Sequence, residues 1–175
     1  MKLSIAQLTA LERQDPVLGV AMKRLPPFPD MPVGNFRGSY FQVLVRSIIY
    51  QQLATKAAAT IYGRVRRLGP GPRFPTPDQM SSLSEERLRE AGLSGNKTKA
   101  IHDLAEKVLR GKLILRGIEH QDDTEIIRHL TTVWGIGEWT AQMFLIFKLG
   151  RLDEIVFNGV SRANHRCQLQ PRNFL

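Results

Sequence analysis

The segment Leu130–Ala141 combines two glycines, two tryptophans and three threonines in a pattern that can bind an anion. Gly135 and Gly137 bracket the single apolar residue Ile136, which predicts a tight turn between two helices. The backbone N–H groups of the second helix, as far as Thr140, have no acceptors in its first turn, and together with the helix dipole they favour a phosphate. A Gly-Ile-Gly turn can also be a simple corner between two apolar helices, so the turn alone leaves both interpretations open.

Other reactive side chains form no pattern of their own. The histidines, His102, His120, His129 and His165, lack a metal-ligand spacing, so no side-chain metal site is expected. The single Cys167 excludes a disulfide within this chain and a four-cysteine iron–sulfur cluster. Motifs for a serine or cysteine nucleophile are absent, and no organic cofactor is expected.

The charge of the chain favours a polyanionic partner. Its 175 residues carry a formal net charge of +9, which suits phosphate contacts, although many small basic proteins have no such ligand. The longest apolar run, Met143–Phe147, is far shorter than the roughly 20 residues that cross a bilayer. Glu12 and Arg13 come too early for a secretory signal. We therefore expect an intracellular protein that does not associate with membranes.

The elements that must position these residues are helices. Apolar residues recur at helical spacing, and no stretch alternates long enough to argue a sheet, so we predict an all-α fold of about eight helices. The residues expected to cap or begin helices are Asp15, Ser39, Thr55, Thr76 and Ser84.

Further helices are predicted in the second half of the chain. They should cover about Asn96–Arg110, Asp123–Val133 and Glu138–Leu149, with Gly111 and Gly150 ending the first and the last. One domain is expected over residues 1–154. Residues 155–175 show no period and are expected to be a loop or disordered tail.

Three separated blocks resemble the helix-hairpin-helix DNA glycosylases, and in particular their 3-methyladenine glycosylase II branch. The blocks are Arg46–Ala58, Ala91–Ser94 with Lys97 or Lys99 and Asp103–Ala105, and Leu130–Ala141. The sequence Gly-Ile-Gly-Glu-Trp-Thr-Ala in the last block carries the resemblance to that branch. Order and spacing match from about Asp15 to Glu154.

The resemblance implies that the hairpin holds DNA phosphate through its main chain and coordinates a monovalent cation through its carbonyls. The residues implied in phosphate binding are Gly135, Ile136, Gly137 and Thr140. Lys148 and Arg151, at the far end of the second helix, would add positive charge.

A wedge is implied on a loop within the first block. Gln51, Gln52 and Leu53 would enter the duplex, and Leu53 would fill the gap that a flipped base leaves. A leucine between two helices is otherwise usually a core residue.

A base pocket is implied at Trp139, with Tyr50 as a second aromatic residue, because an alkylated base is cationic or electron-poor and gains from stacking. Tyr40, Phe41 and Trp134 are further aromatic candidates, but these three residues and Tyr50 are each better explained as core packing. Family members with lyase activity have a lysine at the Trp139 position, so this chain should lack a lyase step.

The catalytic carboxylate of the family is missing from its expected place. The resemblance places an aspartate roughly twenty residues after the pocket tryptophan, where it stabilises the oxocarbenium-like sugar. Asn158 and Gly159 occupy that place, and Asp153 and Glu154 are the last acids in the chain. We expect the aspartate to be lost near Gly159, with Asp153 a poor substitute. A truncated, frameshifted or alternatively spliced product explains the sudden change after Glu154 better than gradual divergence.

These observations predict a DNA-3-methyladenine glycosylase II-like hydrolase. It would act as a monomer on double-stranded DNA containing alkylated bases in base-excision repair, in the cytoplasm or nucleoid of a bacterium or the nucleus of a eukaryote. An inactive DNA-binding module or pseudo-enzyme of the same fold is the alternative, and a helical protein-interaction domain without DNA binding is the third interpretation.

Overall fold

The computed structural model describes residues 5–24 and 36–151. Within these ranges the chain is all-α, as predicted, with nine α-helices, one 3-10 turn, one π-helical turn and no strand. None of the described helices is long and apolar enough to cross a bilayer. The chain divides into two compact units, one that contains residues 5–24 and one that contains residues 36–151. The single domain expected over residues 1–154 stays a prediction. The predicted tail lies outside the described residues.

The N-terminal unit is a pair of short helices, α1 (Ile5–Gln14) and α2 (Pro16–Arg24). Asp15 caps α2 as predicted, because its Oδ1 accepts a hydrogen bond from the backbone N–H of Leu18 at 3.0 Å. Gly19 is buried, and a Cβ at this position would lie 3.2 Å from the Cα of Glu12. The two helices therefore approach each other closely at this glycine.

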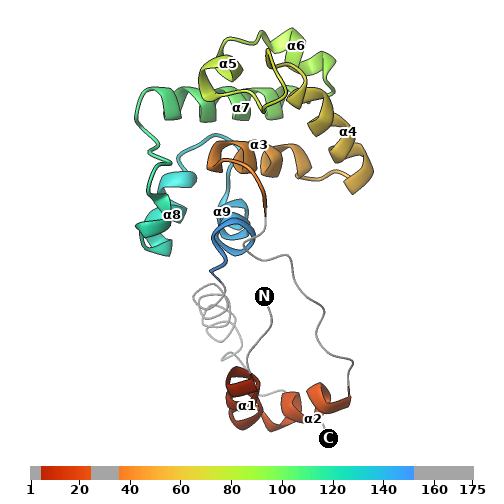
Figure 1. The fold of residues 1–175 in the computed structure, drawn as a ribbon, viewed down its shortest axis with the longest axis vertical. Helices are drawn as coiled ribbons and strands as arrows, with labels where there is room; N and C mark the ends of the chain where they lie inside the picture. The colour runs from red at the N-terminus through yellow and green to blue at the C-terminus, as the bar shows by residue number, and fades with distance from the viewer. Residues whose placement is uncertain (1–4, 25–35, 152–175) are drawn as a thin grey trace, which may run out of the picture. The chain divides into compact units, whose positions relative to one another are not determined.

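The second unit contains the other helices (Figure 1). In chain order they are α3 (Tyr40–Tyr50), α4 (Thr55–Arg66), α5 (Pro77–Ser81), α6 (Glu85–Glu90), α7 (Gly95–Leu109), the 3-10 turn η1 (Ile118–His120), α8 (Asp123–Leu130), α9 (Glu138–Phe144) and the π-helical turn η2 (Leu145–Leu149). Helix α3 lies between α7 and α9, α4 contacts α3, and α8 packs on α9.

The core of this unit is built around α3. Its side chains are buried on nearly every side because α4, α7 and α9 surround it. The buried residues of α3 are Phe41, Val43, Leu44, Val45, Ile48 and Ile49. Helix α7, predicted over about Asn96–Arg110, buries Ile101, Leu104 and Ala105 against this core, whereas Leu109, its last residue, is 48% exposed.

The predicted helix starts at Ser39, Thr76 and Ser84 are confirmed. Each side chain accepts a hydrogen bond from the backbone N–H three residues further on, and Thr76 and Gln79 form the predicted capping box. These caps depend on residues close in sequence, which is why local patterns find them.

The prediction that Thr55 caps α4 was wrong by one residue. Ala54 occupies the cap position and makes no side-chain hydrogen bond, while Thr55 is the first helical residue. The turn that follows α3 is short, so the carbonyl of Ala54 already accepts the first helical hydrogen bond, from the N–H of Ala58 at 3.0 Å.

Two predicted helices have different ends from those expected. Helix α8 ends at Leu130 because the hydroxyls of Thr131 and Thr132 donate to carbonyls of its last turn. The predicted helix from Glu138 to Leu149 changes after Phe144 into the wider turn η2, and the described residues give no physical reason for this change. Gly150 ends η2 with a φ of +76°, as expected for a C-terminal glycine.

Candidate nucleic-acid interface

The Gly-Ile-Gly turn is a hairpin fixed by two buried residues. Val133 and Ile136 are 1% and 3% exposed, and the N–H of Ile136 donates to the carbonyl of Val133 at 3.1 Å. Gly135 has a φ of +77°, and a Cβ there would lie 3.1 Å from the Cβ of Ala100 on α7. Conformation and space both require glycine at position 135.

Gly137 has a different reason to be glycine. Its φ of −91° suits any residue, and a Cβ would meet nothing within 4 Å in the described part of the chain. Gly137 is also the N-cap of α9 and provides no side-chain hydrogen bond to the first turn. The fold does not need glycine here, and the missing side chain leaves room for a ligand to approach the start of α9.

The predicted wedge loop lies at the surface. Leu53 is 38% exposed, which places it on a turn and not in the core. Gln52, before it, has a φ of +54°, a left-handed conformation that few residues other than glycine adopt. The N–H of Leu53 donates to the carbonyl of Tyr50 at 3.4 Å, which closes the turn.

Gln51 connects the wedge loop to the hairpin. Its Nε2 donates to the carbonyl of Gly135 at 3.0 Å and to Oγ1 of Thr140 at 3.1 Å. The Gln51 amide and the Thr140 hydroxyl are therefore used inside the protein, whereas the sequence suggested a contact between Gln51 and DNA. This link holds the two surface segments at a fixed separation.

Lys97 holds the same loop from α7. Its Nζ donates to the carbonyls of Ile49 and Gln51 at 2.7 and 2.8 Å, which the end of α3 leaves without helical partners. Partial burial lowers the pKa of Lys97. The resemblance included Lys97 without giving it a role. Its inward position could have been predicted from the sequence, because Lys97 lies four residues before buried Ile101 and therefore on the same side of α7.

Trp134 is held at the surface by polar side chains of α7. Its backbone N–H donates to Oδ2 of Asp103 at 2.7 Å, and Nζ of Lys99 lies 4.0 Å from its ring centroid. The ring is 51% exposed, so the prediction that Trp134 packs in the core was wrong. These contacts fix the residue immediately before Gly135 from outside the core.

Asp103 is an ionised anchor for the hairpin. Burial by itself would raise its pKa, but hydrogen bonds from Lys107 and from the N–H of Trp134, with the charges of Lys107 and Lys99, lower the pKa overall. The Nζ of Lys107 donates to Oδ1 at 2.7 Å. The anchor therefore depends on a charged carboxylate.

The two predicted pocket aromatics lie on segments that Gln51 joins. Trp139 is 66% exposed on the first turn of α9, next to Thr140. Tyr50 is half-buried next to Gln51, and the guanidinium of Arg46 lies 4.3 Å from its ring centroid. The Trp139 ring is therefore the more accessible for stacking.

Tyr40 and Phe41 belong to the packing, as predicted. Phe41 is 4% exposed, and Tyr40 lies edge-on to Phe144 with ring centroids 5.8 Å apart. The Nζ of Lys148 donates to the carbonyls of Phe36 and Gly38 at 2.9 and 2.8 Å.

Arg151 likewise bonds within the protein, to the carbonyls of Glu119 and Gln121 and to the carboxylate of Asp123. Together with the bonds of Lys148, these contacts correct the expectation that the two side chains assist phosphate binding, because both hold loops of the second unit. Asp153 and Gly159, which bear on the predicted loss of the catalytic carboxylate, lie outside the described residues.

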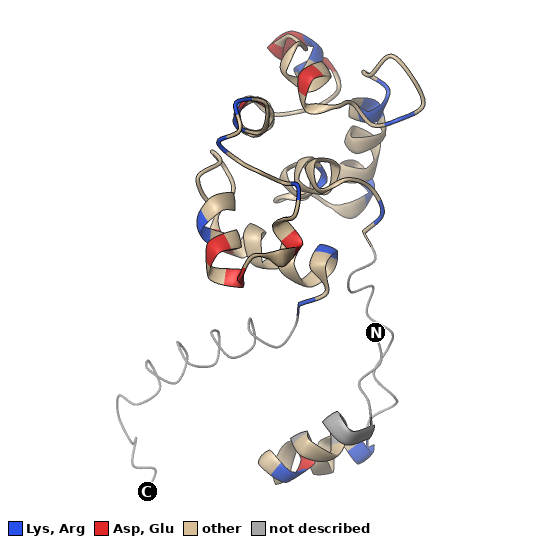
Figure 2. Ribbon diagram, turned by 60° about the vertical axis from the view of Figure 1, so that its left-hand side comes forward, with Lys and Arg blue, Asp and Glu red and all other residues tan. Residues whose placement is uncertain are grey.

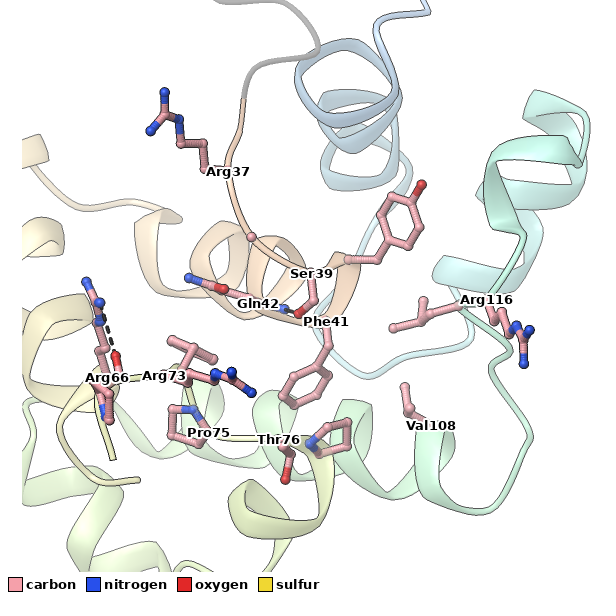
Figure 3. A pocket seen from close by; sticks show the side chains of 16 residues that line it. Arg37, Ser39, Phe41, Gln42, Arg66, Arg73, Pro75, Thr76, Val108 and Arg116 are labelled. Atoms are coloured by element: carbon pink, nitrogen blue, oxygen red, sulfur yellow. Dashed lines mark hydrogen bonds between the residues drawn. The ribbon is translucent and has the colours of Figure 1, made fainter. Parts of the chain in front are cut away.

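Two cavities lie in the second unit. The smaller cavity, of about 370 Å³, lies between the wedge loop and the hairpin. Its lining residues include Gln52, Asn96 and Trp134. The larger, of about 810 Å³, involves the other end of α3 and neither the wedge loop nor the hairpin (Figure 3).

Charge is distributed unevenly over the second unit. The red segments of the ribbon in Figure 2 mark acidic residues on α6 and near α8. Residues 36–77 contain no acid, and their basic residues are Arg37, Arg46, Lys56, Arg64, Arg66, Arg67 and Arg73.

Residues 45–155 match the model of the HhH-GPD superfamily base excision DNA repair proteins. The chain belongs to this superfamily, and its all-α fold with a Gly-Ile-Gly hairpin agrees with the match. DNA-3-methyladenine glycosylase 1 of Schizosaccharomyces pombe is 32% identical over 140 residues, which are 75% of this chain and 61% of that protein. DNA-3-methyladenine glycosylase 2 of Escherichia coli is 30% identical over 114 residues, which are 61% and 40% of the two chains.

Solved structures agree with this assignment. The Schizosaccharomyces pombe 3-methyladenine DNA glycosylase in complex with abasic DNA superposes with a TM-score of 0.71 at 28% identity, over 83% of this chain and 71% of that one. A DNA-3-methyladenine glycosidase from Bacillus halodurans has a TM-score of 0.70 at 40% identity, over 82% of this chain and 64% of that one. The predicted 3-methyladenine branch is confirmed. The chain spans about three fifths or less of the length of the curated relatives it matches.

Proposed function

We propose that the chain is the core of a DNA glycosylase that excises alkylated bases, 3-methyladenine among them, from duplex DNA in base-excision repair. The observation that carries the proposal is the link from Gln51 to Gly135 and Thr140, which holds exposed Leu53 and exposed Trp139 on adjoining segments beside the hairpin. The names of the relatives and the abasic DNA bound to one of them support it.

In this proposal each segment has one task. The start of α9 and the Gly135–Gly137 turn contact a DNA phosphate through the main chain. Leu53 enters the base stack where the target nucleotide leaves it. Trp139 stacks on the flipped base, and the positive charge of an alkylated base strengthens this contact. Because one chain supplies all three tasks, we propose that it acts as a monomer.

The chemical step is a hydrolysis without a lyase reaction. Trp139 occupies the position where a Schiff-base lysine would act, so no covalent intermediate forms there. The family carboxylate that would stabilise the sugar cation is replaced by Asn158 and Gly159. An alkylated base is a good leaving group, so we propose that this chain binds and flips the base but excises it slowly.

A monovalent cation fits the hairpin only in part. The carbonyls of Gly135 and Val133 already accept hydrogen bonds from Gln51 and Ile136. The carbonyl of Ile136 accepts none in the described part of the chain. We propose that Ile136 contributes to such a site, where the cation would supply positive charge next to the DNA phosphate.

The wedge provides the test of this proposal. Fluorescence anisotropy with a duplex containing an abasic site should show that Leu53→Ala lowers affinity about tenfold, because the gap in the stack is no longer filled. The matched control is Leu109→Ala, which removes a somewhat more exposed leucine, 48% against 38%, at the far end of α7 and should change affinity less than about twofold. Equal effects of the two substitutions would remove Leu53 from the DNA interface.

A further inference from the structure

The larger cavity is remote from the proposed DNA interface. Helices α3, α4 and α7 each have one end at the wedge loop, where α3 ends, α4 begins and α7 contributes Lys97. Their opposite ends line the cavity through Gln42, Arg66 and Val108. Eight residues of α3, 43–50, lie between Gln42 at the cavity and the wedge loop, so about 12 Å of helix separates the two sites. A ligand in the cavity can therefore be bound together with DNA at the hairpin.

Apolar side chains form much of the cavity wall (Figure 3). Phe41, Pro75, Val108 and Leu115 are among the lining residues. Phe41 is only 4% exposed, and one face of the Phe74 ring is stacked on Tyr62 with centroids 5.5 Å apart. Tyr40, the third aromatic residue of the lining, is half-buried and lies edge-on to Phe144. Little aromatic surface remains for a nucleobase, whereas an aliphatic or aromatic peptide side chain can be buried here.

Arginines supply the charge of the cavity. Arg37, Arg66, Arg73 and Arg116 line it, and no aspartate or glutamate does. Figure 3 shows Arg37 and Arg116 on opposite sides, with Arg73 extending toward Phe41. Arg66 donates to the carbonyl of Pro72 at 3.1 Å.

The other three arginines have no ion-pair or hydrogen-bond partner in residues 5–24 and 36–151. The carboxylate that reaches a lining residue is Glu119, which is bonded to the hydroxyl of Tyr40. The cavity thus has unpaired positive charge around an apolar wall.

We propose that this cavity binds an acidic segment of a partner protein, with an apolar side chain in the cavity and carboxylates on Arg37, Arg73 and Arg116. A guanidinium binds a carboxylate through two parallel hydrogen bonds, which gives such a contact direction as well as charge. The partner would be held by the chain while the hairpin is on DNA.

Binding of a synthetic peptide tests this proposal. The probe is a short fluorescein-labelled peptide in which aspartate and glutamate alternate with leucine and phenylalanine. The 175-residue chain should bind it saturably in fluorescence anisotropy. The triple variant Arg37→Glu, Arg73→Glu and Arg116→Glu should bind it at least about tenfold more weakly. All three side chains are exposed, and circular dichroism checks the fold.

The matched control reverses the same amount of charge outside the cavity, at Arg87, Arg89 and Arg110. The peptide affinity of this variant should fall by less than about twofold. Glutamine replacements at both sets of positions give the same comparison if the charge-reversed cavity variant does not fold.

Two results would overturn the proposal directly: no saturable peptide binding by the unmodified chain, or equal losses of peptide affinity in the cavity and control variants. A third would be that binding of a single-stranded oligonucleotide depends on the cavity arginines while binding of the peptide does not. The last result would make the cavity a nucleic-acid site.

Discussion

At the scale of single residues, we propose that Trp139 recognises the flipped base. If it stacks on a flipped base, Trp139→Ala should weaken binding to lesion-containing duplex by about 1–3 kcal/mol and binding to undamaged duplex much less. The ring is 66% exposed, so the fold should persist. Fluorescence anisotropy with both duplexes measures the difference.

The control for this prediction is Trp134→Ala, which removes the other exposed tryptophan of the hairpin. It should not distinguish damaged from undamaged DNA. Equal losses on both duplexes in the Trp139 variant would make this residue a general DNA contact or a structural residue.

Asp103 should make the stability of the chain depend on pH, because its ionised carboxylate holds the hairpin. Its pKa is lowered below the ordinary 3.8, so the folded chain holds this proton less tightly than the unfolded chain. The stabilisation is complete above the ordinary value and is lost as the pH falls through the lowered pKa. Asp103→Asn should therefore reduce the free energy of unfolding by about 1–2 kcal/mol at neutral pH.

Urea unfolding at neutral and acidic pH measures this effect. The deficit of the Asp103→Asn variant should shrink as the pH falls below about 4, because the unmodified chain loses its own stabilisation there. A deficit that stays constant in acid would show that the charge of Asp103 does not hold the N–H of Trp134.

At the scale of elements, the two glycines of the hairpin should have different roles, Gly135 in the stability of the turn and Gly137 in DNA binding. Gly135→Ala should lower the free energy of unfolding by at least about 1 kcal/mol, because it combines a positive φ with a contact to Ala100. Gly137→Ala should be nearly neutral for stability, since its φ is negative and its surroundings are open. Thermal unfolding of the two variants makes the comparison, and similar losses in both would contradict the described turn.

Gly137→Asp tests the same turn for DNA binding. A carboxylate at this position would repel a phosphate, so affinity should fall on every sequence, with stability close to that of Gly137→Ala. Anisotropy on unrelated duplexes checks the generality of the loss. Unchanged affinity would mean that the hairpin does not contact DNA.

The elements were predictable wherever the signal is local. The caps at Ser39, Thr76 and Ser84 and the glycines of the hairpin depend on residues within a few positions of each other, so sequence patterns found them. The bonds of Gln51 to Gly135 and Thr140 join residues more than 80 positions apart. Only the packing of α3 against α7 and α9 brings them together, which a single sequence does not reveal.

The same limit explains the errors. Trp134 was predicted in the core because large aromatic residues are usually buried, but Asp103 and Lys99 on α7 hold it at the surface. The arginine-lined cavity draws on α3, α7 and the 66–77 segment, so its residues showed only as general positive charge in the sequence.

At the scale of the molecule, the net charge of +9 should make DNA affinity depend steeply on salt. Contact with about four phosphates would reduce affinity about a hundredfold between roughly 50 and 200 mM salt. Anisotropy titrations at several salt concentrations give the slope. An affinity that does not change with salt would contradict a phosphate-binding hairpin.

Release of methylated bases tests the central claim most directly. The measurement compares free 3-methyladenine and 7-methylguanine released from alkylated duplex DNA by the 175-residue chain and by a chimera. In the chimera, residues 155–175 are replaced by a family-like segment with the aspartate. A chain that holds and flips the base but lacks the carboxylate should release bases slowly, and the chimera should be faster by several powers of ten, on the order of the electrostatic contribution to such a step. A folded chimera that releases no base above background would contradict the glycosylase assignment, and full activity of the unmodified chain would contradict the missing carboxylate.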